Sequence, residues 1–111
     1  MAAPTQIPKS VYSGKPTTSS VAIVTGVPAN KAWLLTILAC NDTSVDAALE
    51  LRRKLSGGSE MTMYSSSRNI PAGMTVPIPA IVLETGDELF ALQVTSDAIV
   101  VHVDALEVPT A

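Results

Sequence analysis

Short segments in which apolar and polar residues alternate recur along the whole chain of 111 residues. Turn-forming residues such as Gly, Pro, Asn and Asp separate these segments, and an alternation with a period of two is typical of β-strands. The expected strands cover residues 11–13, 19–27, 31–40, 45–55, 60–66, 74–83, 88–95 and 98–108. About eight short strands without a convincing helix predict an all-β fold, namely an antiparallel β-sandwich of the jelly-roll type.

Residues 45–55, VDAALELRRKL, have two interpretations. The residue types favour a helix, and Asp46 could serve as its N-cap. However, Leu49 and Leu51 alternate with charged residues along the segment, and Leu51 falls outside the apolar stripe that a helix would need. The alternation and the strands expected on both sides therefore favour a strand.

The run KAWLLTILAC at 31–40 is apolar on both faces of the expected strand. One face would carry Trp33, Leu35, Ile37 and Ala39. A strand of this kind is central in its sheet and is covered by the core on one side. The opposite face needs a second cover, and we expect a homodimer contact there, with the chain's own N-terminal arm as the alternative. The predicted dimer interface contains Leu34, Leu38 and Cys40.

Two similar segments, VPANKAWL at 27–34 and IPAGMTVP at 70–77, predict turns that each precede a strand. In both, an apolar residue precedes Pro-Ala, and a residue that tolerates a positive φ, Asn30 or Gly73, follows.

Two further turn signals concern the second half of the chain. Pro77 and Pro79 cannot donate ladder hydrogen bonds, so the strand at 74–83 is expected at a sheet edge or at a bend. The short separator SDA at 96–98 predicts a tight hairpin between the last two strands.

The first nine residues have little apolar surface beyond Ile7, and they contain Pro4 and Pro8. We expect an extended N-terminal arm over residues 1–9, followed by a single β-sandwich domain over residues 10–111. Prolines keep such an arm extended, which lowers the entropic cost of ordering it on a partner.

Residues 83–89, LETGDEL, place three carboxylates around one glycine. A calcium site would need six to eight ordered oxygen ligands, and a glycosidase pair would need a cleft with aromatic side chains. A turn explains each residue more simply, because Gly86 supplies the positive φ and Asp87 bonds to the local backbone. We therefore predict a turn and no metal.

His102 and Cys40 are the only histidine and the only cysteine. His102 and Asp104 share one strand face and resemble part of a catalytic triad, but no serine has the context of a nucleophile elbow. One histidine and one buried thiol are too few ligands for a transition-metal centre. The expectation is a non-enzymatic protein without metal or cofactor, with His102 on the sheet surface and Cys40 as an inert thiol.

Composition restricts the partners and the cellular compartment. The net charge is −3 and the isoelectric point is about 4.9, which argues against nucleic acid as a partner. No apolar stretch is long enough to span a bilayer, and the N-terminus lacks the features of a signal peptide. We expect no association with a membrane. We expect the protein to be assembled in a host cytoplasm.

Three segments carry a family resemblance: VPANKAWLLTILACND, IPAGMTVPIPAIVLETGDEL and SDAIVVHVDALEV. Together they resemble the small jelly-roll capsid decoration proteins, also called staple or cement proteins, of short-tailed enterobacterial bacteriophages. The resemblance covers residues 20–108. It implies a non-enzymatic virion protein on the outer capsid surface that clamps subunits of the major capsid protein of the same phage, often as a dimer, and thereby stabilises the head.

Within this interpretation, the expected capsid-binding residues come from the arm and its surroundings: Pro4, Ile7, Pro8, Lys9 and Lys15. Bridging contacts at many sites would add up to stabilise a pressurised head. Two alternatives are an adaptor in the phage neck, tail or fibre, and a carbohydrate-binding β-sandwich module.

Overall fold

A computed structural model describes residues 6–110 of the chain, which contain nine β-strands and no helix. The all-β prediction is therefore confirmed. The strands are β1 (Ile7–Gly14), β2 (Val21–Val24), β3 (Lys31–Asn41), β4 (Ala47–Lys54), β5 (Glu60–Tyr64), β6 (Asn69–Ile70), β7 (Thr75–Glu84), β8 (Glu88–Gln93) and β9 (Ile99–Pro109).

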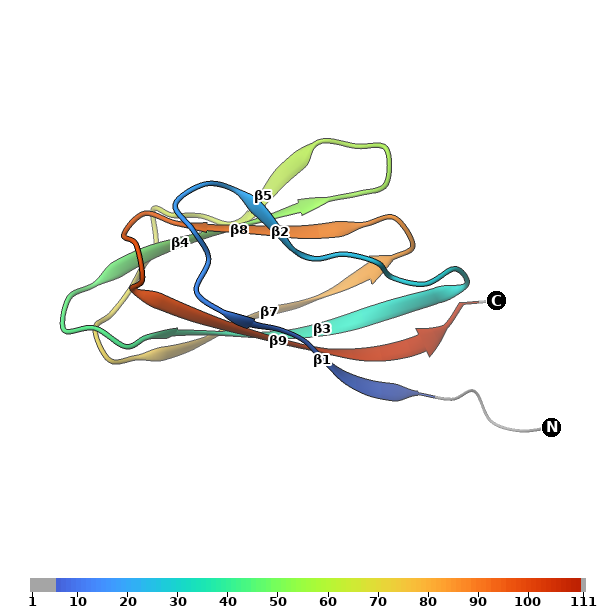
Figure 1. Cartoon of the computed structure of the whole chain (residues 1–111), viewed down its shortest axis with the longest axis horizontal. Helices are drawn as coiled ribbons and strands as arrows, with labels where there is room; N and C mark the ends of the chain where they lie inside the picture. Colours follow the sequence, from blue (N-terminus) through green and yellow to red (C-terminus); the bar gives the residue numbers. More distant parts are fainter. Residues whose placement is uncertain (1–5, 111) are drawn as a thin grey trace.

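The strands form two antiparallel sheets packed as a sandwich (Figure 1). The first sheet has the order β1-β9-β3-β7, and the second has the order β2-β8-β4-β5 with the short β6 paired to β4. Apart from β6, the first strand pairs with the last, the second with the second-last, and so on inward to the pair β4–β5. This nesting of antiparallel pairs is the topology of a jelly roll.

The core lies between the two sheets and consists of the inward-facing residues of alternating strands. In β3 and β4 every second residue is buried, as the period of two requires. Each fully buried Leu or Ile stabilises the fold by about 1.5–3 kcal/mol relative to an exposed one. The largest fully buried apolar side chains are Leu35, Ile37, Leu49, Leu51, Ile70, Leu83, Leu89 and Ile99.

Several local predictions are confirmed. The ambiguous segment forms strand β4, with Leu49 and Leu51 fully buried. The proline-containing strand β7 lies at the edge of its sheet and has an irregular register opposite Leu35 and Ile37. Both Pro-Ala segments are turns before strands, because Asn30 and Gly73 have positive φ values of 60° and 72°.

The predicted hairpin between the last two strands is wrong. Strand β8 pairs with β2 and β4, whereas β9 pairs with β1 and β3, so the segment between them crosses from one sheet to the other. The buried side chain of Gln93 holds this crossover. Its Oε1 accepts hydrogen bonds from the backbone N–H groups of Ala98 (3.2 Å) and Ile99 (2.8 Å). Its Nε2 donates to the carbonyl of Pro16 (2.6 Å).

The expected boundary after residue 9 falls inside strand β1. Ile7, Pro8 and Lys9 pair in register with Glu107, Leu106 and Ala105 of β9, so these three residues belong to the first sheet. Residues 1–5, including Pro4, lie outside the described residues. The strand expected over 19–27 is shorter, and β6 was not predicted because two residues give no periodic signal.

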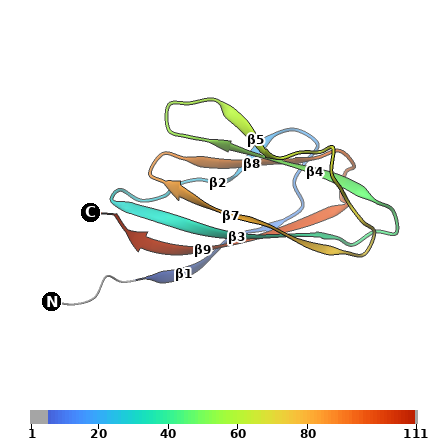
Figure 2. The same cartoon turned by 180° about the vertical axis from the view of Figure 1, so that it is seen from behind.

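The two ends of the sandwich differ. The start of β1 and the end of β9 lie at one end, where Figures 1 and 2 also place the β7–β8 turn. The opposite end carries the loops β3–β4, β6–β7 and β8–β9. The body is elongated, with extents of 53 × 28 × 18 Å.

Candidate assembly surface

The outward face of the first sheet is largely apolar. Leu34 and Leu38 of β3 and Val82 of β7 are exposed by 39–43% of their surface. Leu34 stands between Val82 and Leu106 in the ladder, so these side chains form one cross-strand row. We call this surface the apolar outer face and define it by Leu34, Leu38, Cys40, Val82, Val100, Leu106 and Val108.

The predicted dimer residues Leu34, Leu38 and Cys40 all lie on this face, with Cys40 half-buried and its thiol free. Sequence reasoning did not include Val82 and Leu106, although both alternate correctly within their own strands. The missing information was the register between strands β3, β7 and β9. Their role in a dimer contact remains a prediction.

The middle of this face is polar. His102 lies opposite Leu38 in the ladder, is exposed, and shares a hydrogen bond of 2.7 Å between its Nδ1 and Ser13 Oγ. Asp104 follows on the same face, so a serine, a histidine and an aspartate lie near one another. Ser13, however, lies in regular strand β1 rather than on the strained strand-to-helix turn that exposes a nucleophilic serine. The arrangement fits a surface histidine, as expected.

The outward face of the second sheet carries charged residues beside half-buried Phe90 and Leu92, and the charges described here are paired within the chain. The Arg52 guanidinium contacts the Glu50 carboxylate at 2.5 Å and the Glu60 carboxylate at 3.6 Å. The hydrogen bond with Arg52 holds the pKa of Glu50 below its ordinary value, and the same bond raises the pKa of Arg52. Lys54 and Glu88 are directly opposite each other in the ladder, and the Lys54 ammonium lies 4.0 Å from the Glu88 carboxylate.

The described part of the N-terminal arm does not cover the apolar outer face. Strand β1 extends the sheet at its edge instead. Ile7 and Pro8 are exposed, but Lys9 is held by the chain itself. Its ammonium donates to Glu107 Oε1 at 3.0 Å and lies 5.2 Å from the centre of the Trp33 ring.

Trp33 and Glu107 form a buried polar pair beneath Lys9. The indole Nε1–H of Trp33 donates to Glu107 Oε1 at 2.9 Å. This bond, followed by that from Lys9, lowers the pKa of Glu107 below its ordinary value. The network fixes the start of β1 to the sheet, and sequence reasoning missed it because its partners are 74 and 98 residues apart.

Lys15 also has partners within the chain. Its ammonium lies 3.4 Å from the carboxylate of Asp42 and donates to the carbonyl of Asp97 at 3.0 Å. Both lysines that were expected to meet a capsid surface would have to exchange these contacts for new ones. Their contact with a capsid remains a prediction.

The acidic segment LETGDEL is a turn between β7 and β8, as predicted. Asp87 is buried, and its carboxylate accepts hydrogen bonds from the backbone N–H groups of Ser56 and Glu84, both at 2.9 Å. Gly86 has a φ of 87°, and a Cβ at this position would lie 2.6 Å from Ser56 Oγ. Asp87 therefore joins this turn to the β4–β5 turn, and its oxygens are occupied by backbone donors.

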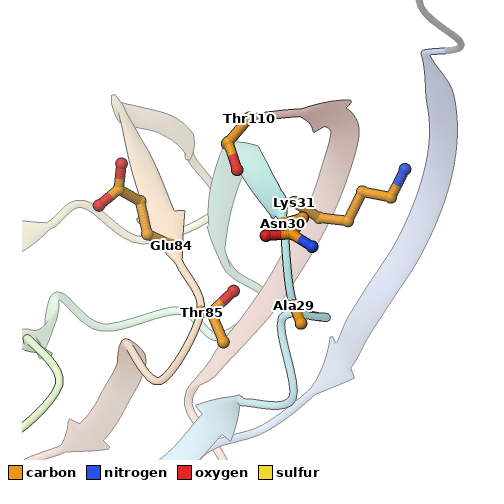
Figure 3. A pocket seen from close by; sticks show the side chains of 6 residues that line it. All are labelled: Ala29, Asn30, Lys31, Glu84, Thr85 and Thr110. Carbon is orange, nitrogen blue, oxygen red and sulfur yellow. The ribbon is translucent and has the colours of Figure 1, made fainter.

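A shallow polar pocket of about 390 Å³ lies at the end with the termini (Figure 3). Its charged groups are one lysine and one glutamate, and the hydroxyl of Thr85 donates to the carbonyl of Pro28 at 2.6 Å. These residues contain no nucleophile with an adjacent base. The lining residues are Ala29, Asn30, Lys31, Glu84, Thr85 and Thr110.

Among residues 6–110, no three His, Cys, Asp or Glu side chains are grouped so that they could hold a metal ion. The same residues contain no helix that is long and apolar enough to cross a membrane.

No protein family and no curated protein sequence matches the chain. Solved structures do match. A chain from the disulfide-linked pili of Bacillus endospore appendages has a TM-score of 0.63 at 8% identity, covering 99% of this chain and 93% of that one. The VP2 subviral particle of infectious bursal disease virus has a TM-score of 0.57 at 12% identity, covering 96% and 33%. The structure of the Gx strain of that virus has a TM-score of 0.62 at 10% identity, covering 98% and 33%.

At these identities the likeness concerns the fold alone. The chain spans about a third of the matched viral chains and nearly the whole of the matched pilus chain. The same β-sandwich thus occurs in proteins that assemble into virus particles and into pili.

Proposed function

We propose that this protein is a structural component of a phage particle that binds the outside of the head and clamps subunits of the major capsid protein together. The observation that carries the proposal is the apolar outer face, which no other part of residues 6–110 covers. Exposed apolar patches of this kind mark interaction surfaces. The fold, which also occurs in the matched virus particle, supports a structural role.

In this proposal the apolar outer face is buried in a homodimer, against the same face of a second copy. In a two-fold contact the same patch is used twice, so the row Leu34, Val82 and Leu106 of one copy packs against the apolar outer face of its partner. The dimer then presents two copies of every other surface. Each additional site strengthens binding to a repetitive lattice, because the second contact is made at a high effective concentration.

The N-terminal segment contributes a second contact in this proposal. Ile7 and Pro8 are exposed at the start of β1, and we assign them to this contact together with the expected arm residues before them, of which residues 1–5 lie outside the described residues. Deleting residues 1–5 should leave Tm almost unchanged and weaken binding to heads. Equal binding of the deleted and full-length chains would assign the contact to the folded domain alone.

The direct test is a titration of undecorated phage heads with the purified protein. We expect binding that saturates at a fixed number of copies per head, and heads that withstand a higher temperature when decorated. Binding to purified tails or necks but not to heads would favour the adaptor. Binding to glycans alone would favour a carbohydrate-binding module, although Trp33 is buried and offers no aromatic platform.

A second candidate is a subunit of a self-assembling filament. The specific observation in its favour is the match to the pilus chain, which covers almost all of both chains. Sedimentation velocity distinguishes the two proposals, because a capsid clamp stops at a dimer, whereas a filament subunit forms a continuous series of larger species.

A further inference from the structure

The end of the sandwich opposite the termini carries exposed apolar side chains on three different loops. Val45 in the β3–β4 loop is 69% exposed and Met74 in the β6–β7 loop is 51% exposed. Val94, just before the β8–β9 crossover, is also exposed. Figures 1 and 2 both show these loops gathered at the end away from the start of β1 and the end of β9. We call residues 42–46, 71–74 and 94–98 the loop platform.

The loops that hold Val45 and Met74 are fixed from beneath by one buried side chain, Asn41. Its Nδ2 donates to the carbonyls of Val45 (2.8 Å) and Ile70 (2.9 Å), and its Oδ1 accepts from the N–H of Thr43 (3.0 Å). The backbone N–H of Asn41 donates to the carbonyl of Met74 at 2.9 Å. Asn41 is completely buried, so these bonds are protected from water.

Further bonds join the three loops to one another. The carboxylate of Asp46 accepts from the N–H of Ala72 at 3.1 Å, which links the first loop to the second. The N–H of Asp42 donates to the carbonyl of Ala98 at 3.4 Å, which links the first loop to the third. Lys15 contacts both Asp42 and the carbonyl of Asp97. The loop platform is therefore one braced unit.

A braced loop that holds an apolar side chain in water is suited to docking. The loop has already lost its conformational freedom, so binding does not have to order it, and burial of the valine or methionine contributes directly to affinity. A loop without these hydrogen bonds would have to become ordered on binding, and the entropic cost would offset part of the binding free energy that burial of the same side chains contributes. Exposed apolar side chains add nothing to the stability of the free protein.

The charges of the loop platform indicate the chemistry of the partner. The three loops that carry the apolar side chains also carry Asp42, Asp46 and Asp97, and Lys15 is the cation that contacts the Asp42 carboxylate and the backbone carbonyl of Asp97. A net negative rim is complementary to a basic surface. We infer that the loop platform docks onto a protein surface with an apolar recess rimmed by lysine or arginine, and that Val45 and Met74 are its anchors.

This inference rests on the proposed function and specifies which end of the molecule meets the head. The apolar outer face covers the side of the sandwich, so a dimer formed through it leaves both loop platforms free. The protein would then carry one contact for its second copy and a different contact for the capsid.

The test compares two substitutions that remove apolar surface at opposite ends. The double variant Val45→Ser/Met74→Ser removes both anchors. Leu55→Ser is the matched control, because Leu55 is 50% exposed in the β4–β5 turn at the end with the termini. Neither change touches a buried side chain, so Tm and dimerisation should stay unchanged. We expect at least 10-fold weaker binding of the double variant to undecorated heads, and unchanged binding of Leu55→Ser.

A charge variant tests the rim separately. Asp97 has a φ of 60°, which asparagine tolerates, so Asp97→Asn removes the charge and keeps the loop. Binding to heads should weaken a few-fold at low salt, and the difference should shrink at high salt because salt screens the interaction.

The outcomes separate the two proposals. If the wild-type protein does not bind heads, both the proposed function and this inference fall. If the wild type binds and the Val45→Ser/Met74→Ser variant binds equally well, the function stands and the loop platform is not the docking end. Equal weakening by Leu55→Ser would also overturn the inference, because the effect would not belong to one end.

Discussion

The two outward faces of the sandwich belong to sheets that bury the same kind of inner surface, yet they differ in chemistry. On the second sheet, the guanidinium of Arg52 forms ion pairs with the carboxylates of Glu50 and Glu60. On the first sheet, no other layer of the described chain covers Leu34 and Leu38, and about two-fifths of each side chain remains exposed. The inward alternation specifies the fold in both sheets, while the outward residues decide which sheet can bind another molecule.

The energetics of the two faces differ accordingly. Exposed ion pairs contribute at most about 1 kcal/mol each, so the charged face adds solubility more than stability. Apolar surface that becomes buried in a contact contributes about 25 cal/mol per Å² before the costs of association. The apolar outer face therefore has the larger capacity for assembly.

The largest effect is expected for Leu38→Asp, which places a charge on the apolar outer face, opposite His102 in the ladder. Burying a carboxylate in a dimer contact costs several kcal/mol, so the dimer dissociation constant should rise by about 100-fold or more. Leu38 is exposed in the monomer, and the fold should persist. Sedimentation equilibrium gives the dissociation constant, and circular dichroism checks the fold.

The control is Thr62→Asp on the charged face, where exposed Thr62 lies opposite Arg52 in the ladder. Dimerisation of this variant should equal that of the wild type. If the two substitutions weaken the dimer equally, or if Leu38→Asp leaves it intact, the difference between the faces does not decide assembly.

A smaller effect, on stability, is expected for Glu107→Gln at the edge of the first sheet. The pKa of Glu107 is lowered in the folded protein by Trp33 and Lys9, so its ionised form stabilises the fold. This contribution is fully present above the unfolded pKa of about 4.3 and is lost as the pH falls through the lower folded pKa. Glu107→Gln should reduce Tm at pH 7 and approach the wild type below about pH 4. A Tm difference that does not change with pH would show that the charge of Glu107 has no role.

The smallest effect is expected for Glu50→Gln on the charged face. Its pKa is also lowered, by Arg52, so the sign of the pH dependence is the same as for Glu107. The pair is nearer to solvent, and the change in the free energy of unfolding should stay below about 1 kcal/mol. Thermal unfolding at low and high salt measures it. A larger loss than that of Glu107→Gln would reverse the ranking of the two sites.

Local signals in the sequence predicted much of this molecule. The alternation around Leu49 and Leu51 identified β4, the prolines of β7 placed it at an edge, and the residues of LETGDEL defined a turn. Each of these features depends on residues that are close together in the chain.

Features that depend on distant pairing were not predictable. The crossover between β8 and β9 follows from the sheet order and from the bonds of Gln93, and a short separator gives no information about either. The Trp33–Glu107 pair and the role of Asn41 require the register between strands far apart in sequence. The sequence of β3 alone identified Leu34 and Leu38 as members of the apolar outer face. The register of β3 with β7 and β9 added Val82 and Leu106.

The most direct test of the central claim is a cryo-electron microscopy reconstruction of undecorated heads mixed with excess protein. We expect ordered additional density on the outer surface, in which the β1-β9-β3-β7 sheets of two copies face each other across a two-fold axis. Heads without ordered additional density, or bound copies whose apolar outer face is turned to solvent, would contradict it.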